Sequence, residues 1–504
     1  MKPDTSVRWR RRVPLLSGSR LILVPVGDED VVLHPPGPPG QVVDVAAAVR
    51  DALRFPLAGP PLDEMVKRGG RATLLVEPAA LPLPGAPQDA RQTAIATAIA
   101  ELERCGIPDE RQTILVGGGL GRRFGQHDLE RLLSPQQARG FRGQVVVHDA
   151  EDPRLEPIVD GIRINSALVD TDVVLAVTAA ETILHGGPGA FLAACDASTV
   201  RSVAGVESLL EASGSPAWAL VLRLEAALMQ RVPLAGVSLV LDLPRLTGRY
   251  SGYPHDDRAV ARVARSPLRT AFSLLPGPFR RDVLARYGRR MAATGAFAGL
   301  PSIAHAEALL RGVARRGTRL AEPMDALVVG VPWIGPHVPR EQLNPVTTAA
   351  VALGLALRLR RDAFPVRPNG TLVLVHRLTR SFAPVTQAPY AAMFDALRAA
   401  QTPGELNESE RTAATDERAL AAYRDGKACH PLLPYADWAG CAPALSRLGQ
   451  VVVAGCRDAL AARTLGFVPS HGIGSALQMA HGVAGGRARV GVLLAPPYAP
   501  LVVG

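Results

Sequence analysis

The sequence TLLV at residues 73–76, followed by QTAIATAIAELER at 92–104 and TILV at 113–116, decides the fold class of this chain. The two short runs are apolar and rich in β-branched residues, as buried strands are, whereas the longer segment is made of strong helix formers. Strands that recur between helices predict βαβ units and a mainly parallel sheet.

The same alternation extends in both directions from this stretch. In the first part of the chain we expect further strands at 21–26, 144–147, 173–177 and 237–241, and helices at 128–133, 197–210 and 217–230. After an irregular helical segment the pattern resumes, with expected strands at 326–331, 371–376, 450–454 and 489–494 and helices at 347–360 and 458–465. We therefore predict an α/β protein of two domains, each with a mainly parallel sheet flanked by helices, and a ligand cleft between them. The predicted boundaries are 1–264 for the N-terminal domain, 265–322 for a helical connection and 323–504 for the C-terminal domain.

Composition excludes several classes of protein. A chain of 504 residues with 47% hydrophobic residues is long and apolar enough for two buried cores. The net charge of +10 is carried almost wholly by arginine, since the only lysines are Lys2, Lys67 and Lys427. These arginines are scattered along the chain and not clustered between aromatic residues, so we expect no nucleic-acid partner. The apolar runs are too short to span a membrane, and five cysteines without a C-x-x-C pair favour a cytoplasmic protein without disulfides.

A glycine-rich turn follows the strand at 113–116. It carries Gly118, Gly119 and Arg122. Such a turn lets a ligand approach the backbone, so these three residues are candidates for binding an anion, although a plain connecting turn explains them equally well. The dinucleotide fingerprint fails because its third glycine is absent, and no lysine lies in a P-loop context.

A second glycine-rich loop contains His185, Gly186 and Gly187. It has the composition of the oxyanion-hole loop of an esterase, but the chain has no G-x-S-x-G nucleophile elbow to accompany it. We keep these residues as candidates for ligand binding. On the opposite wall of the cleft, Trp333, His337 and Asn344 are further candidates, because they follow the first strand of the C-terminal domain.

Most of the chain resembles the nickel-pincer lactate racemase family (LarA-type). The likeness rests on the order and spacing of several stretches, namely 102–108, 114–118, 147–153, 164–174, 214–216, 237–242, 324–330, 366–375 and 465–467. Asn344-Pro345 and Ala388-Pro389-Tyr390 are more similar to a divergent branch of the family than to the racemases themselves.

The resemblance implies a chemistry whose key side chains this sequence lacks. In such racemases a lysine holds the nickel-pincer nucleotide covalently, one histidine binds nickel, other histidines move protons and an arginine orients the substrate. The matching positions hold Ala193 for the lysine, Ile183 for the nickel ligand, Gly121 for a proton-transfer histidine and Leu81 for the arginine. No lysine occurs between Lys67 and Lys427, so no shift of alignment restores the anchor.

These losses favour a lactate racemase-like protein that is not an active lactate racemase and that binds a small anionic or nucleotide ligand in its cleft. Two alternatives stay open. One is a 2-hydroxyacid racemase or epimerase, an isomerase, with a non-covalently held nickel pincer and His185 as metal ligand. The other is a hydrolase that uses the His185 loop. The sequence leaves the catalytic residues, the cofactor and the oligomeric state undetermined, and it predicts a small-molecule ligand as partner.

Overall fold

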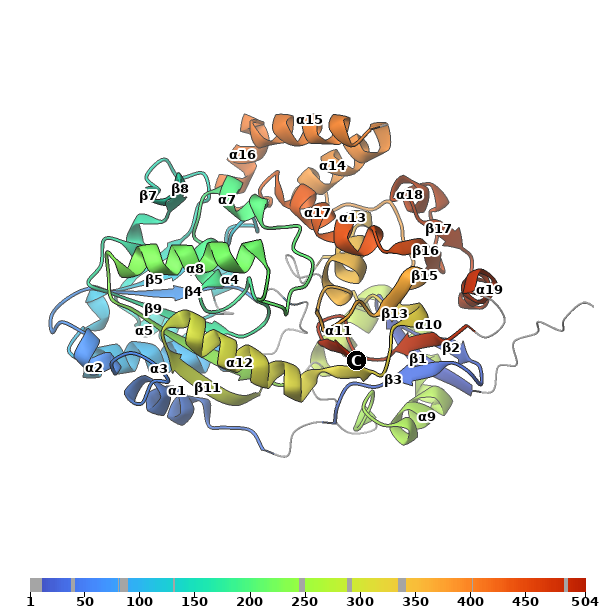
Figure 1. Ribbon diagram of the computed structural model, residues 1–504, viewed down its shortest axis with the longest axis horizontal. Coiled ribbons are helices and arrows are strands. Elements are labelled where there is room, and N and C mark those ends of the chain that lie inside the picture. Colours follow the sequence, from blue (N-terminus) through green and yellow to red (C-terminus); the bar gives the residue numbers. More distant parts are fainter. Residues whose placement is uncertain are drawn as a thin grey trace, which may run out of the picture.

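The computed structural model describes residues 11–37, 41–79, 81, 89–129, 132–243, 250–287, 292–333, 341–400, 402–484 and 488–504. They form two lobes that lie side by side, with the N-terminal sheet in the left lobe of Figure 1 and the C-terminal sheet in the right one. Within these described residues no helix is long and apolar enough to cross a membrane.

The first lobe is built on a six-stranded sheet in the order β11-β10-β9-β4-β5-β6. Its strands are β4 (Ala72–Val76), β5 (Gln112–Val116), β6 (Gln144–Val147), β9 (Val173–Ala179), β10 (Leu234–Leu241) and β11 (Ala293–Gly299). All pairs are parallel except β10 with β11. Because β4, β9 and β10 are buried along their whole length, helices must cover both faces of this sheet.

Two pairs of helices do so. The helices α1 (Val45–Arg54) and α3 (Ala90–Arg104) pack against each other, and α8 (Pro216–Met229) packs against α12 (Pro301–Arg316). The smaller elements of this part are α2 (Leu62–Met65), α4 (Gln126–Leu129), α5 (Pro135–Gly140), β7 (Glu156–Val159), β8 (Ile162–Ile164), α6 (Gly189–Leu192) and α7 (Ala197–Ser202).

The second lobe contains a parallel six-stranded sheet in the order β17-β16-β15-β13-β18-β3. Its strands are β3 (Val31–Leu33), β13 (Met324–Gly330), β15 (Val366–Val375), β16 (Leu448–Ala454), β17 (Val468–Ser470) and β18 (Val490–Leu493). The accompanying helices are α13 (Pro345–Ala349), which continues as a π-helix over Ala350–Ala356, then α14 (Ala388–Ala399), α15 (Pro403–Ala414), α16 (Glu417–Arg424), α17 (Leu433–Leu445), α18 (Ala459–Thr464) and α19 (Ile473–Ala484). A small sheet of β12 (Thr318–Leu320), β19 (Leu501–Val503) and β14 (Arg360–Arg361) lies beside them.

The predicted α/β class, with mainly parallel sheets flanked by helices, is confirmed. Three predicted helices differ in extent: 197–210 contains only the short α7, 128–133 overlaps only α4, and 347–360 is divided between α13 and the π-helical turns. Residues 203–210 instead form an irregular segment, in which the Leu209 N–H donates a hydrogen bond to the Arg358 carbonyl of the second lobe at 2.8 Å. Tertiary contacts therefore override the local helical pattern there.

Sheet membership does not follow the predicted domain ranges. The strand β3 pairs with β18 of the second sheet, and the hairpin of β1 (Arg11–Ser17) and β2 (Arg20–Val26) shares a hydrophobic cluster with β13, β15 and β16. Conversely, β11 and α12 lie within the predicted connection yet belong to the first sheet and its cover. Further helices are α9 (Asp257–Arg265), at the end of the predicted N-terminal domain, and α10 (Pro267–Leu274) and α11 (Gly277–Tyr287), within the predicted connection. A strand pattern in the sequence predicts that a segment joins a sheet, but it does not show which sheet. The sequence therefore could not reveal that the chain passes from one lobe to the other and back.

Candidate functional site

Three acidic side chains follow three neighbouring strands of the first sheet. Glu77 comes directly after β4, Glu181 follows β9 and Asp242 follows β10. The order β10-β9-β4 and the shared strand direction place all three at the carboxyl edge, where open α/β sheets bind their ligands. All three are buried.

A buried arginine balances this charge. Arg91 of α3 forms ion pairs with Glu181 (Nη1 to Oε1, 3.1 Å) and with Asp89 (Nη2 to Oδ2, 2.8 Å). Burial, together with the nearby charge of Glu181, raises the pKa of Glu77 to about 8, while the Gly186 N–H and Arg91 act in the opposite direction. Glu77 is therefore mostly protonated at neutral pH, and the cluster holds one carboxyl group that can donate as well as accept a proton.

The loop with His185 is tied to the rest of the first lobe. The Thr182 hydroxyl and His185 Nδ1 are 2.8 Å apart, and the Gly187 N–H donates to the Thr178 hydroxyl at 2.9 Å. The Gly186 N–H points at the Glu77 carboxyl group. Because both glycine amides already have acceptors inside the protein, the loop does not present them as an oxyanion hole.

The glycine turn after β5 joins the two lobes. Arg122 donates to the Asp128 carboxylate (2.6 Å) and to the Gly426 carbonyl of the second lobe (3.1 Å). The Gly119 carbonyl accepts a hydrogen bond from the Tyr423 hydroxyl at 3.4 Å, and Gly118 has open space around its Cα. The only hydrogen-bonding side chain among these candidates is thus engaged between the lobes and is not left for an anion.

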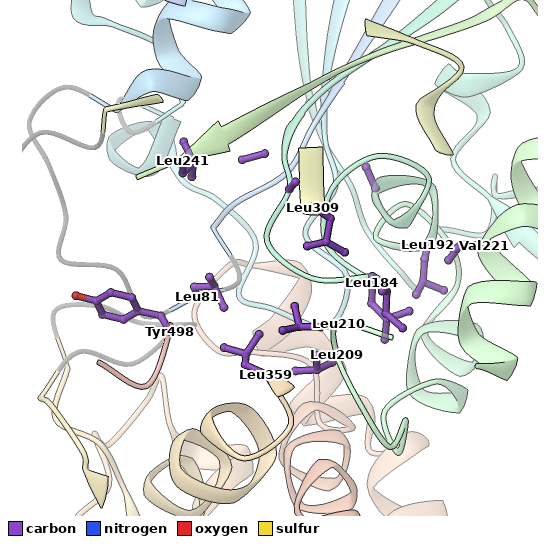
Figure 2. Close-up of a cluster of buried hydrophobic side chains, with 14 of the residues drawn as sticks. Leu81, Leu184, Leu192, Leu209, Leu210, Val221, Leu241, Leu309, Leu359 and Tyr498 are labelled. Atoms are coloured by element: carbon purple, nitrogen blue, oxygen red, sulfur yellow. The ribbon is translucent and has the colours of Figure 1, made fainter. Parts of the chain in front are cut away.

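The positions that the sequence resemblance aligns with the family's catalytic residues lie in apolar or tightly packed surroundings. Leu81 and Ile183 are 3% and 1% exposed and belong to the main hydrophobic core. Figure 2 shows Leu81 in the same buried hydrophobic cluster as Leu210 of the first lobe and Leu359 of the second. The Gly121 N–H donates to the Gly118 carbonyl, which makes this position part of the turn itself. Ala193 ends α6 and lies against Gly117.

These surroundings do not fit a covalently held nickel pincer. By the correspondence that the resemblance implies, a methyl group takes the place of the lysine anchor, and aliphatic side chains take the places of a metal-binding imidazole and a substrate-binding guanidinium. Within the part of the chain that the structure describes, no three His, Cys, Asp or Glu side chains are grouped to hold a metal ion.

The candidates of the second lobe are placed as follows. Trp333 is half-buried and follows Pro332, which bridges to Gly18 of the β1–β2 turn. His337 lies outside the described residues. Asn344 caps α13, where its Oδ1 accepts from the Thr347 N–H at 3.0 Å, and its buried Nδ2 has no hydrogen-bond partner. Asn344 therefore acts first as a structural cap and retains one unused donor.

The charged cluster at the edge of the first sheet was missed by the sequence reasoning. The signal of its members in the sequence was an acidic residue one or two positions after each of three buried strands. That signal gains meaning only once the three strands are known to be neighbours, which the order β10-β9-β4 establishes.

Comparison with known proteins finds two likenesses to lactate racemases, one in the N-terminal sequence and one in the fold. Residues 18–181 match the model of the lactate racemase N-terminal domain. The structure is similar to the lactate racemase apoprotein from Thermoanaerobacterium thermosaccharolyticum, with 12% sequence identity, a TM-score of 0.61 and coverage of 98% of this chain and 100% of that chain. A protein from Thermotoga maritima shows 11% identity and a TM-score of 0.46, over 85% of this chain and 93% of that one. No curated protein matches the sequence. Residues 18–181 of this chain therefore match a lactate racemase N-terminal domain, and the chain as a whole is similar in fold to a lactate racemase apoprotein.

Proposed function

We propose that this chain is a lactate racemase-like protein that does not racemise lactate and that serves instead to bind a small anionic molecule. The observation that carries the first half is the position of Leu81. It replaces the family's substrate-binding arginine and is 3% exposed among leucines of both lobes. A carboxylate substrate would meet hydrocarbon there in place of a bidentate cation.

The other replaced positions support the same conclusion. Without the lysine at Ala193 a pincer nucleotide would be held by reversible binding alone, and without imidazoles at Ile183 and Gly121 the nickel loses a ligand and the substrate loses a general base. A positioned base contributes about a hundred- to ten-thousand-fold in rate. His185, whose Nδ1 is 2.8 Å from the Thr182 hydroxyl, can replace at most one of these groups.

The test is production of the chain together with the enzymes that make the pincer nucleotide, with the lactate racemase from Thermoanaerobacterium thermosaccharolyticum treated in parallel as the positive control. We expect an intact mass equal to that of the unmodified chain, no stoichiometric nickel and no interconversion of D- and L-lactate. Lactate turnover in the wild type that is lost in His185→Ala would overturn the proposal and establish a nickel site at His185.

A further inference from the structure

Four arginines from four separate segments gather at the carboxyl end of the second sheet. Arg377 follows β15, Arg457 follows β16, Arg20 begins β2 and Arg280 lies on α11. We call these four residues the arginine cluster.

Backbone hydrogen bonds bring the first two arginines together. The neighbouring strands β15 and β16 end at the same level, since Val375 is paired with Ala454 and the His376 N–H donates to the Ala454 carbonyl at 3.3 Å. The Arg457 N–H then donates to the carbonyl of Leu378, the residue after Arg377, at 3.2 Å. The two arginines therefore leave adjacent strands at one edge of the sheet.

The β1–β2 turn brings the other two arginines to the same edge. The Gly18 N–H donates to the Val331 carbonyl at 2.7 Å, and the Val331 N–H donates to the Val375 carbonyl at 3.4 Å, so the turn lies over the end of β13 beside β15. Arg280 Nε donates to the hydroxyl of Ser19, the residue before Arg20, at 3.2 Å.

The charges of the arginine cluster act on one another. Burial lowers the pKa of the Arg377 guanidinium, and the positive charges of Arg20, Arg457 and Arg280 lower it further. Burial and the charge of Arg20 also lower the pKa of Arg280. Among the described residues none of the four forms an ion pair with a carboxylate, and Asp458, next to Arg457, directs its Oδ1 to the Ala461 N–H of α18. Like charges held together without counter-charges destabilise a fold, and an anion would relieve that repulsion.

We propose that the arginine cluster binds a small phosphorylated molecule that carries at least two negative charges. Guanidinium groups pair bidentately with phosphate oxygens, and several of them around one site suit a phosphate monoester or diphosphate better than a monocarboxylate with a single charge. The carboxyl edge of parallel strands is where open α/β sheets bind such ligands. This inference names the ligand class for the binding half of the proposed function and is independent of whether the chain racemises lactate.

The experiment titrates the full chain with inorganic pyrophosphate by isothermal titration calorimetry at physiological ionic strength, with acetate as a monoanionic comparison. The test variant is Arg377→Gln/Arg457→Gln, which spares the buried Arg280. The matched control is Arg315→Gln/Arg319→Gln, which removes two exposed arginines of the first lobe and of β12 and so changes the net charge equally.

We expect saturable one-to-one binding of pyrophosphate, tighter than that of acetate, in the wild type and in the control. In the test variant the affinity should fall by about tenfold or more for each guanidinium removed. Absence of saturable binding by the wild type, or equal weakening in both variants, would overturn the proposal. A single-stranded oligonucleotide that binds more tightly than pyrophosphate, and loses its affinity only in the test variant, would also overturn it in favour of a nucleic-acid surface. None of these readouts depends on lactate turnover, so failure here leaves the racemase test intact.

Discussion

Gly187 packs directly against the side chain of His305, and its backbone has a φ of 53°. His305 is completely buried, and its Nε2 lies 2.9 Å from the Thr182 carbonyl, so it cannot move aside without losing that bond. The glycines of this loop are thus required by a helix of the same lobe, and they would be required whether or not a ligand binds.

From this contact we predict that Gly187→Ala destabilises the protein by about 3 kcal/mol, because the new Cβ would overlap His305 and sit in a left-handed backbone conformation. The matched variant Gly118→Ala has open space around its Cβ and should change stability by less than about 1 kcal/mol. Thermal unfolding of both variants beside the wild type measures the difference. Equal unfolding temperatures for the two variants would contradict the packing described above.

The raised pKa of Glu77 predicts a pH-dependent stability. In the folded protein this pKa is about 8, compared with an ordinary value of 4.5, because of burial and the charge of Glu181. At a pH between about 4.5 and about 8, folding is therefore accompanied by the uptake of a proton at Glu77. The stabilisation is complete below about pH 4.5 and is lost as the pH rises through about 8, by up to about 1.4 kcal/mol per pH unit. Besides Glu181, the groups that face Glu77 are Arg91 and the Gly186 N–H.

The variant Glu77→Gln keeps the shape of the side chain and removes its titration. We expect its unfolding temperature to fall less steeply than that of the wild type as the pH is raised from about 5 to about 8. Glu64→Gln, at an exposed position of α2, is the control and should follow the wild type. Parallel curves for wild type and Glu77→Gln would show that Glu77 is not the group responsible.

Arg358 joins the lobes by hydrogen bonds to backbone carbonyls. Its guanidinium donates to Val206 (2.7 Å) and Ala204 (3.0 Å) of the first lobe and to Gly440 (3.1 Å) of the second. We predict that Arg358→Met destabilises the protein by about 3 to 5 kcal/mol, because these buried carbonyls lose their donor. Arg361→Met, at an exposed neighbouring position, should have little effect. Thermal unfolding and limited proteolysis of residues 203–210 measure the loss of the lobe contact.

Arg122 is expected to affect stability and not ligand affinity. Its bonds to Asp128 and to the Gly426 carbonyl are structural, so Arg122→Gln should lower stability by about 1 to 2 kcal/mol. Pyrophosphate affinity, measured by calorimetry, should equal that of the wild type. A loss of affinity in this variant would return the anion site to the glycine turn.

The relation between sequence and structure differs from one element to the next. The strands at 73–76 and 113–116 and the helix at 92–104 were predictable because an unbroken apolar run or a series of strong helix formers has one stable outcome in a chain of this length. The helix predicted at 197–210 was not, because its second half forms hydrogen bonds to the other lobe that a local pattern cannot reveal.

The candidate site shows the same division. The amino-acid sequence by itself determined that no lysine can anchor a pincer nucleotide, since this is a matter of which side chains exist. The tertiary structure decided what the remaining charges do. Arg122, which was a candidate for binding an anion, forms a hydrogen bond between the lobes instead. Arg377 and Arg457 are far apart in the chain, but the pairing of β15 with β16 brings them to adjacent strand ends. Electrostatic interactions act over a few ångströms of space, and only folding sets those distances.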